Sequence, residues 1–271
     1  MDRKIEPDLG SKASTASGEQ DFTVTLSNTT AESIPQDEEQ CIVRIQGHKQ
    51  TLRFHDYDLI YPVPGLYEHI FYELLGCRSP QWVGRMLSNE WEREGVNPAT
   101  LKVLDVGAGN GMMGEVLRKA GVRRIVGTDI LPEARNAALR DRPGVYEEYI
   151  AGDLTQLTPE VEERLQNYRF DAMTLVAALG FGDIPPEVFL SAYNLVSNGG
   201  WVAFNIKEDF MEDRIHGPFA RLLRHMQDTR GFEVLMHSNY IHRRSVTGEP
   251  LRYNAFVGRK RCDIAMEALG N

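Results

Sequence analysis

The chain is poor in cysteine, lacks long apolar runs and has fewer basic than acidic residues, and each of these shortages excludes a class of protein. Its three cysteines, Cys41, Cys77 and Cys262, show no paired CxxC spacing, so neither a disulfide framework nor a zinc site is indicated. The N-terminus is polar and no stretch is long enough to span a bilayer. We therefore expect a protein of the reducing cytoplasm without a membrane anchor or a metal.

The charge balance disfavours a nucleic-acid partner. The 30 Lys and Arg residues against 39 Asp and Glu residues give a formal net charge of −9, whereas nucleic-acid binders usually carry a clustered basic footprint. Two short basic groups, 242–244 and 259–261, lie near the C-terminus. We interpret both groups as solvated ends of strands or loops.

The order of segments predicts one main domain behind a smaller N-terminal region. Residues 1–40 contain few large apolar side chains, which predicts a mostly disordered tail. Residues 41–100 predict a helical cap or lid that follows a short strand at Ile42, Val43 and Ile45. Within it, one helix ends near Gly76 and another begins at Ser79 and Pro80. We place the main domain at 101–262 and a C-terminal tail at 263–271.

Strand and helix patterns alternate from Leu101 onward, as in parallel βαβ units. No helix fits between the last two strands, so we expect the final strand to return antiparallel. The fold class is α/β, with a seven-stranded, mostly parallel sheet and helices on both faces. The expected strands are 102–106, 124–128, 146–151, 170–177, 201–206, 232–240 and 253–257, with helices from near Gly111, Pro132, Pro159 and Pro185.

The strongest motif is the segment 103–111, VLDVGAGNG, in which an apolar strand runs into a glycine turn and then a helix. Glycine allows the backbone to turn sharply and to lie against a ligand where a Cβ would collide, and the amides at the helix start face an anionic group. A dinucleotide fingerprint would need its third glycine at Met112. The spacing favours S-adenosylmethionine over NAD, and a purely structural strand-to-helix joint is the alternative.

Two acids follow at the ends of the next strands. Asp129 lies roughly twenty residues after the turn, where a carboxylate accepts both ribose hydroxyls of a nucleotide. Asp153 ends the third strand and is placed to accept from an adenine amino group, while Leu154 packs on the ring. Each acid has a plainer alternative as the cap of the helix that follows it.

Residues 101 to about 259 resemble the class I S-adenosylmethionine-dependent methyltransferases, which have a Rossmann-like fold. The DVGAGNG turn, GTDI at 127–130 and AGDL at 151–154 match the first three motifs of that family in order and spacing. The resemblance implies that the turn cradles the methionine portion and that Asp105 supports the turn or the ligand amine. The implied cofactor-binding residues are Tyr57, Asp105, Gly107, Ala108, Gly109, Asn110, Gly111, Asp129, Ile130, Asp153, Leu154 and Ala177.

The segment after the fourth strand reads AALGF at 177–181, not the Asn/Asp-Pro-Pro-aromatic sequence of enzymes that methylate exocyclic amines. Methyl transfer is an in-line displacement, so orientation is the main task of the protein, and a general base is needed only if the acceptor must lose a proton. The candidates for that base are His55 and His69, while Tyr61 is a further catalytic candidate that shapes the pocket together with Tyr57. All four side chains have a structural alternative as core or surface residues.

The sequence therefore favours a methyltransferase that acts on a small molecule, such as a secondary metabolite. The alternatives are a protein or RNA methyltransferase and a non-catalytic protein that binds S-adenosylmethionine. An NAD-dependent oxidoreductase is disfavoured by the glycine spacing. The sequence leaves open the acceptor atom and the oligomeric state.

Overall fold

The computed structural model describes residues 22–27, 34–179, 184–209 and 217–269. The chain divides into two compact units, which we call the N-terminal unit (residues 1–77 and 243–250) and the sheet unit (residues 78–242 and 251–271). The second piece of the N-terminal unit is the tip of the hairpin between the last two strands. The chain thus passes from one unit to the other three times.

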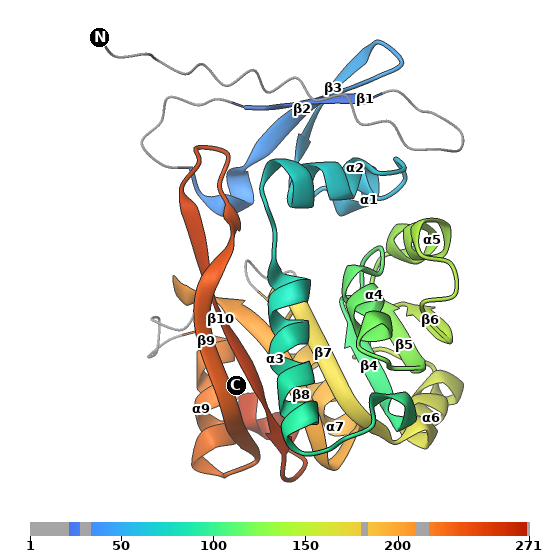
Figure 1. Cartoon of the computed structure of the whole chain (residues 1–271), viewed down its shortest axis with the longest axis vertical. Helices are drawn as coiled ribbons and strands as arrows, with labels where there is room; N and C mark the ends of the chain where they lie inside the picture. The colour runs from blue at the N-terminus through green and yellow to red at the C-terminus, as the bar shows by residue number, and fades with distance from the viewer. Residues whose placement is uncertain (1–21, 28–33, 180–183, 210–216, 270–271) are drawn as a thin grey trace. The chain divides into compact units, whose positions relative to one another are not determined.

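The sheet unit contains the mixed seven-stranded sheet that the sequence predicts (Figure 1). Its strand order is β6-β5-β4-β7-β8-β10-β9. The first five strands pair in parallel, and β10 pairs antiparallel with β8. The expected antiparallel return of the final strand is confirmed. The strands are β4 (Lys102–Val106), β5 (Arg124–Asp129), β6 (Glu148–Ala151), β7 (Phe170–Leu179), β8 (Val196–Lys207), β9 (Phe232–Arg244) and β10 (Pro250–Lys260).

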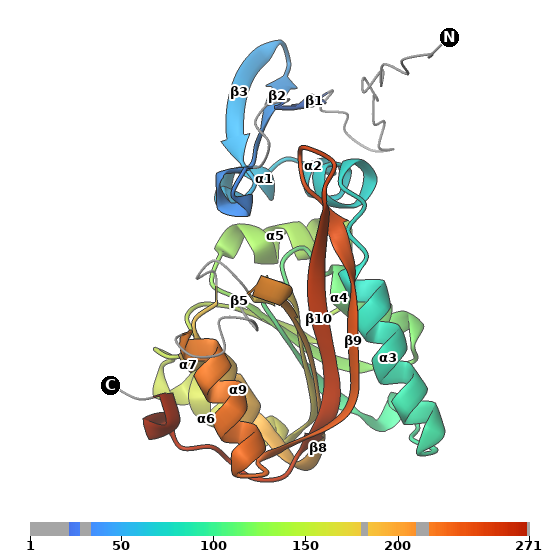
Figure 2. The same ribbon diagram turned by 90° about the vertical axis from the view of Figure 1, so that its left-hand side faces the viewer.

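Helices cover both faces of this sheet. Figure 2 shows α3 and α4 on one side and α6, α7 and α9 on the other. Five of the helices have proline in their first turn, where its missing N–H costs no hydrogen bond. The helices are α3 (Ser79–Arg93), α4 (Met112–Lys119), α5 (Pro132–Asp141), α6 (Pro159–Tyr168), α7 (Pro186–Leu195) and α9 (Pro218–Asp228), with short 3-10 turns η3 (Pro98–Thr100) and η4 (Met266–Leu269).

The core consists of one apolar cluster on each face of the sheet. Successive residues of β8 show the division, because Trp201 and Ala203 belong to one cluster while Val202 and Phe204 belong to the other. A parallel strand that is buried on both faces needs apolar residues at every position, not an alternating pattern. This requirement explains the continuous apolar runs of the sequence.

Helix α3 belongs to the sheet unit, which corrects its assignment to the predicted cap at 41–100. Its buried side chains Val83, Leu87 and Trp91 join the same core cluster as Val103 of β4 and Trp201 of β8. Figure 1 shows α3 lying along β7 and β8. The helix spacing was predicted correctly, but the sequence alone did not indicate which surface the helix covers.

The N-terminal unit contains a three-stranded antiparallel sheet, which the sequence analysis largely missed. Its order is β1-β2-β3, with β1 at Phe22–Leu26, β2 at Gln40–Ile45 and β3 at His48–Arg53. Only β2 was expected. Because β1 lies within 1–40, the expectation of disorder is wrong at 22–26, where Phe22 and Val24 alternate with threonines and enter the core.

The helical part of the N-terminal unit follows its sheet. It comprises α1 (Tyr57–Ile60), α2 (Leu66–Glu68) and the π-helical segment η2 (His69–Leu74), while the 3-10 turn η1 (Gln36–Glu38) precedes β2. The apolar positions Leu66, Ile70 and Phe71 are buried, and Gly76 has a φ of 67° just after the last turn. The predicted helix and its end at Gly76 are confirmed.

The two basic groups near the C-terminus are not simply solvated. His242, Arg243 and Lys260 are 5%, 3% and 0% exposed. Arg243 forms an ion pair with buried Glu39 at 2.5 Å, and Lys260 donates to the backbone oxygen of Val196 at 2.6 Å. A buried cation must be paired: Glu39, distant in the sequence, pairs with Arg243, whereas nearby Asp263 pairs with Lys260 at 2.5 Å. The interpretation as solvated ends is therefore wrong for these buried residues.

None of the helices in the described parts of the chain combines the length and the apolar character needed to cross a membrane.

Glycine at position 258 of β10 is required by close packing against β9. A Cβ built on Gly258 would lie 2.2 Å from the backbone oxygen of Glu233 and 2.7 Å from the Phe232 ring. We expect Gly258→Ala to lower the free energy of unfolding by about 1–3 kcal/mol, measured by denaturant titration. Gly152→Ala is the matched control, because a Cβ at Gly152 meets nothing within 4 Å. Equal stability of the two variants would contradict the packing argument.

Candidate functional site

The glycine turn joins β4 to α4 through three left-handed residues. Gly107, Gly109 and Gly111 have φ values of 62°, 54° and 92°, a region that residues with a Cβ rarely adopt. The Ala108 amide donates to the backbone oxygen of Thr128 at 2.9 Å, which ties the turn to the end of β5. The sequence prediction of a sharp glycine turn between a strand and a helix is confirmed.

Close approach adds a second requirement for glycine at position 107. A Cβ there would lie 2.9 Å from Cδ1 of Ile184 and 3.0 Å from Cβ of Ala178. Ala178 lies near the end of β7, the strand next to β4 in the sheet. The turn is therefore packed against the carboxyl end of the neighbouring strand, as well as against β5.

Asp129 ends β5 and connects directly to the glycine turn. Its Oδ2 accepts from the Gly109 amide at 2.9 Å, and its Oδ1 accepts from the Leu131 amide at 3.0 Å. Burial raises the pKa of this carboxyl, while the bonds from the Leu131 and Gly109 amides oppose that rise. The two predicted motifs thus meet in space. The N-cap of α5 is Leu131 and no side chain caps that helix, so Asp129 is not its cap, and the ligand role of Asp129 stays a prediction.

Ile130 follows this acid and is 65% exposed. Such exposure of a large aliphatic side chain is informative beside a polar site, because it leaves an apolar surface next to the Asp129 carboxylate. The assignment of Ile130 to cofactor binding, which the family resemblance implies, stays a prediction.

Asp105 is buried and holds the underside of the turn. Its Oδ1 accepts from the Thr174 hydroxyl at 2.7 Å and its Oδ2 accepts from the Tyr146 hydroxyl at 2.7 Å. Burial raises the pKa of Asp105 to about 6, and the two hydroxyl bonds act against this rise. Of the two roles predicted for Asp105, support of the turn is the one that these contacts favour.

Sequence reasoning missed two tyrosines that pack beneath the turn. Besides its bond to Asp105, the Tyr146 ring occupies space next to Gly111, Gly114 and Gly127, where an added Cβ would lie 2.6–3.2 Å from it. Tyr149 donates from its hydroxyl to the Gly109 backbone oxygen at 2.7 Å. The only sequence signal was the presence of glycine in α4 and β5, which indicates close packing but not its partner.

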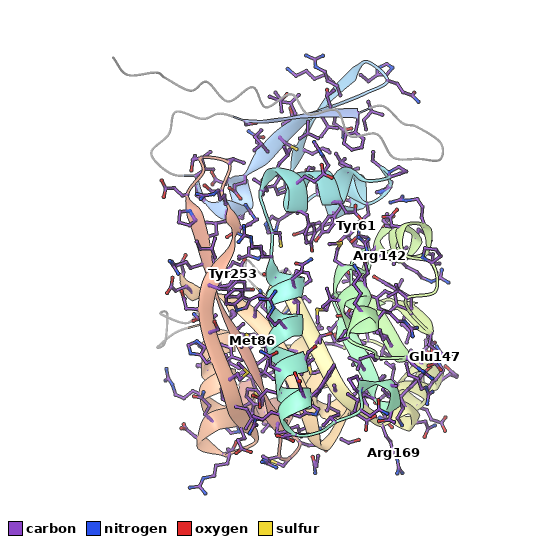
Figure 3. All side chains as sticks on the ribbon, in the orientation of Figure 1. Tyr61, Met86, Arg142, Glu147, Arg169 and Tyr253 are labelled. Carbon is purple, nitrogen blue, oxygen red and sulfur yellow. The ribbon has the colours of Figure 1, made fainter. Side chains whose placement is uncertain are left out.

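Asn110 and Arg142 close the helix end of the turn. Asn110 is 1% exposed, and its backbone oxygen accepts from the Arg142 guanidinium at 3.0 Å. The same guanidinium contacts Glu115 of α4 at 3.1 Å. Figure 3 shows Arg142 beside α4. The side chain of Asn110 is therefore part of the packed turn in this structure.

Asp153 and Leu154 follow β6 at the same edge of the sheet. The Asp153 carboxylate accepts from the Thr155 amide at 2.8 Å, the Thr155 hydroxyl at 2.7 Å and the Gln156 amide group at 3.1 Å. These bonds lower the pKa of Asp153. Leu154 is 8% exposed and belongs to the core. Asp153 organises a local turn and does not cap α6, whose N-cap is Thr158.

Ala177 has a strained backbone near the end of β7. Its φ of 62° lies in the left-handed region, which typically costs about 1–3 kcal/mol for a residue other than glycine. The pairing of β7 with β8 shifts register between Leu175 and Leu179, so Ala177 lies in a bulge. Its amide donates to Oδ1 of Asn205 on β8 at 2.7 Å. Bulges with strained backbones often occur beside functional sites.

The residues predicted from the segment before α3 lie in the N-terminal unit. Tyr57 stacks on Tyr61 with ring centroids 5.8 Å apart, and His55 lies 5.8 Å from Tyr57. His69 is 1% exposed, with its Nδ1 2.6 Å from Oε2 of Glu73 and its ring against Phe22. The burial of His69 favours its structural alternative. The assignments of Tyr57 to cofactor binding and of His55 and Tyr61 to catalysis stay predictions.

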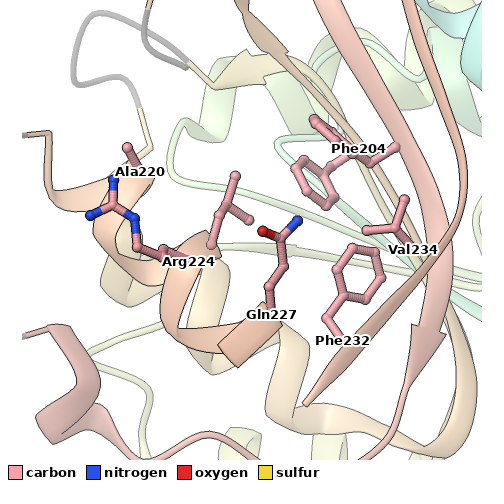
Figure 4. A pocket seen from close by; sticks show the side chains of 8 residues that line it. Phe204, Ala220, Arg224, Gln227, Phe232 and Val234 are labelled. Atoms are coloured by element: carbon pink, nitrogen blue, oxygen red, sulfur yellow. The ribbon is translucent and has the colours of Figure 1, made fainter. Parts of the chain in front are cut away.

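A pocket of about 340 Å³ lies between α9 and strands β8, β9 and β10. Figure 4 shows Gln227 of the helix toward Phe204, Phe232 and Val234 of the strands, while the Arg224 side chain points the other way, toward Ala220. None of the predicted cofactor or catalytic residues lines it.

Comparison with known proteins gives one family match over residues 78–249, more than half of the chain, to a family described as "Methyltransferase domain". The chain is 27% identical over 137 residues to a mitochondrial ubiquinone biosynthesis O-methyltransferase of Candida albicans, a match covering 49% of this chain and 41% of the relative. It is 32% identical over 117 residues to a ubiquinone biosynthesis O-methyltransferase of Pseudomonas fluorescens, covering 42% of this chain and 48% of the relative. The matches thus span less than half the length of these curated relatives.

Among solved structures, the chain is similar to a magnesium protoporphyrin IX methyltransferase from Synechocystis with bound S-adenosylmethionine. The TM-score is 0.46 at 17% identity, and the match covers 67% of this chain and 79% of that one.

The raised pKa of buried Asp105 predicts a pH-dependent stability. Between its ordinary pKa of 3.8 and its folded pKa of about 6, the folded chain keeps a proton that the unfolded chain releases. Stability is therefore lost as the pH rises through this window, by about 3 kcal/mol at most, since a tenfold change in proton affinity is worth about 1.4 kcal/mol. We expect the stability of the native chain relative to Asp105→Asn to fall by up to this amount between pH 4 and pH 6 in denaturant titrations. A difference that is constant with pH would contradict the assignment.

Proposed function

The chain belongs to the methyltransferase domain family, and we propose that it catalyses methyl transfer from S-adenosylmethionine to a small-molecule acceptor. The observation that carries this proposal is the contact between the Gly109 amide and the Asp129 carboxylate, at 2.9 Å. It brings the glycine turn and the acid of the next strand to one point at the carboxyl edge of the sheet, where open α/β sheets bind nucleotides.

The family match confirms two expectations from the sequence, the resemblance to class I methyltransferases and S-adenosylmethionine as the cofactor. The NAD alternative had already been disfavoured because Met112 stands where a dinucleotide fingerprint has glycine.

The residues at the turn fit this cofactor. The left-handed glycines expose backbone where a Cβ would intrude, Asp129 offers a carboxylate for hydroxyl groups, and Ile130 offers an apolar surface beside it. We propose that Gly107 to Gly111 hold the methionine portion and that Asp129 holds the ribose. Asp153 and Leu154 would lie at the adenine, with Ala177 nearer the methyl group. When bound, the cofactor supplies a methyl group on a sulfonium, which is a good leaving group.

The acceptor is proposed to be a small molecule with a hydroxyl group. The support comes from the curated relatives, which are named ubiquinone biosynthesis O-methyltransferases, and from the net charge of −9, which does not favour an RNA substrate. A hydroxyl acceptor must lose its proton, so the enzyme would need a base. His55 is our candidate for that base, with Tyr61 as a further catalytic candidate, because His69 is buried and its Nδ1 faces Glu73.

The experiment that tests this function is calorimetry with S-adenosylmethionine, its demethylated product and NAD, followed by transfer of labelled methyl groups to a panel of phenols and catechols. We expect micromolar binding of the first two ligands, no binding of NAD and label in at least one acceptor. Gly109→Val is the inactive control, because valine does not adopt a φ near 54°. Binding without transfer to any small molecule, but with transfer to protein or RNA, would refute the proposed acceptor class. Absence of all binding would refute the function.

The role of Asp129 yields a sharper prediction. Asp129→Ala removes a charged hydrogen-bond acceptor, so we expect S-adenosylmethionine to bind about 10- to 150-fold more weakly, equivalent to about 1.5–3 kcal/mol. Asp171→Ala is the matched control, since the Asp171 carboxylate also accepts from a backbone amide, that of Lys102, but at the opposite edge of the sheet. The measurement is calorimetry on both variants. Unchanged affinity of Asp129→Ala would remove Asp129 from the site.

A further inference from the structure

A buried cluster of four polar side chains lies in the sheet unit outside the predicted cofactor residues. It consists of Ser79 from the start of α3, Asn205 from β8, and Tyr240 and His242 from β9, all at most 5% exposed. The Ser79 hydroxyl lies 2.6 Å from the Tyr240 hydroxyl and 2.6 Å from Nδ1 of His242. Three polar groups from β8 and β9, those of Asn205, Tyr240 and His242, thus converge on the Ser79 hydroxyl.

The hydrogen bonds of Asn205 have a fixed direction. The backbone amide of Ala177 can only donate, so the Asn205 atom 2.7 Å from it must be the oxygen. The amide nitrogen of Asn205 then donates to the Ser79 hydroxyl at 3.1 Å and to the Tyr240 hydroxyl at 2.8 Å. The carbonyl oxygen and both N–H donors of Asn205 are used in one arrangement, and a rotated amide would place a donor against the Ala177 N–H.

Aromatic packing holds the other members of the cluster in place. The Tyr240 ring stacks on Trp82, with centroids 5.1 Å apart and planes 4° from parallel. The His242 ring lies 4.1 Å from the ring of Tyr253 on β10, which is labelled in Figure 3. Trp82 is 39% exposed, and the stacking covers the face of its indole that lies on Tyr240. The cluster is thus a rigid support for Asn205.

The cluster is linked to the glycine turn through the bulge in β7. Asn205 holds the amide of Ala177, which has the left-handed φ of 62°. The next residue, Ala178, has its Cβ 3.0 Å from the position that a Cβ on Gly107 would occupy. A continuous series of contacts therefore runs from His242 through Ser79, Asn205 and the bulge to the first glycine of the turn.

We propose that Asn205 is a positioning residue for the methyl-transfer site, supported by Ser79, Tyr240 and His242. By holding Ala177 in its strained conformation, Asn205 keeps the bulge of β7 against Gly107 and so fixes one wall of the cofactor turn. The expected effect of Asn205 on turnover rests on the proposed function. The expected effect of Asn205 on the conformation of the glycine turn does not, because it is measured without ligand.

Burial alone does not account for such a cluster. Buried polar side chains stabilise a fold little more than apolar ones of similar volume, even when all their hydrogen bonds are made. The cluster instead fixes the position of one acceptor, the Oδ1 atom of Asn205. The Ala177 amide in the bulge must lie at that position to donate its hydrogen bond. The cluster lies beside the C-terminal end of β8, at the edge of the sheet that carries the turn.

The test is Asn205→Ala, examined first without ligand. We expect hydrogen–deuterium exchange in peptides covering 103–112 and 172–179 to accelerate about tenfold, because loss of the Ala177 bond lets the bulge leave its strained conformation. Asn194→Ala is the matched control. The Asn194 side chain also makes two bonds with backbone, to the oxygen and amide of Ile264 at 2.8 and 3.0 Å, but outside this series of contacts. Unchanged exchange at 103–112 in Asn205→Ala would overturn the proposal.

A rescue separates positioning from general stabilisation. Glycine adopts a φ of 62° without strain, so the double variant Asn205→Ala with Ala177→Gly should recover most of the protection at 103–112. Ser79→Ala, which removes a single oxygen atom, should accelerate exchange in the same peptides by a smaller factor. The melting temperatures of Asn205→Ala and the double variant are compared with that of Asn194→Ala. If all three agree and the double variant still exchanges as fast as Asn205→Ala, Asn205 has only a structural role.

Binding provides the second readout. If only a tenth of Asn205→Ala molecules hold the turn correctly, S-adenosylmethionine binds about tenfold more weakly, because apparent affinity scales with the competent fraction. The maximal rate should fall further than this, since the bulge is proposed to lie nearest the methyl group. Failure of the native chain to bind S-adenosylmethionine would refute the proposed function, while the exchange comparison would still decide the role of Asn205.

Discussion

The glycine turn can be a binding site only because backbone and side-chain bonds from β5 hold it in its left-handed conformation. The Ala108 amide is bound to the Thr128 oxygen, and the Gly109 amide is bound to the Asp129 carboxylate, each at 2.9 Å. Glycine lowers the cost of the left-handed backbone but does not select it, because glycine is flexible in the unfolded chain as well. These two bonds select the left-handed conformation of the turn. The buried hydrogen bond from the Tyr146 hydroxyl to Asp105, beneath the turn, adds to this restraint.

Much of this arrangement could be predicted from the sequence because it depends on local order. The β4 strand, the turn and α4 are contiguous, and each acid follows its own apolar strand, so the topology of a parallel sheet brings Asp129 and Asp153 to one edge. The predicted strands and helices of the sheet unit agree with the structure, although several strands extend further, β6 begins two residues later than predicted, and α9 was not predicted. The sequence could not indicate that the Asp129 carboxylate accepts a hydrogen bond from the Gly109 amide.

What escaped prediction depends on pairs far apart in the chain. Ser79 and His242 are separated by 163 positions, and a histidine next to two arginines resembles a solvated basic group until its partner is known. The β3 strand was missed because Leu52 is its only buried residue, so the strand shows no alternation. Helix α3 has a clear apolar stripe, but no helix pattern reveals whether its stripe covers a sheet or another helix.

The register of β9 is the constraint that joins these separate features. His242 binds Ser79 in the sheet unit, whereas the adjacent Arg243 pairs with Glu39 in the N-terminal unit. Neighbouring side chains of a strand point to opposite faces, so a slip of one residue would exchange the imidazole and the guanidinium. Each unit would then receive a buried group without its partner, at a cost of several kcal/mol for the cation. The register of β9 is thus constrained within each unit separately, at His242 by Ser79 and at Arg243 by Glu39.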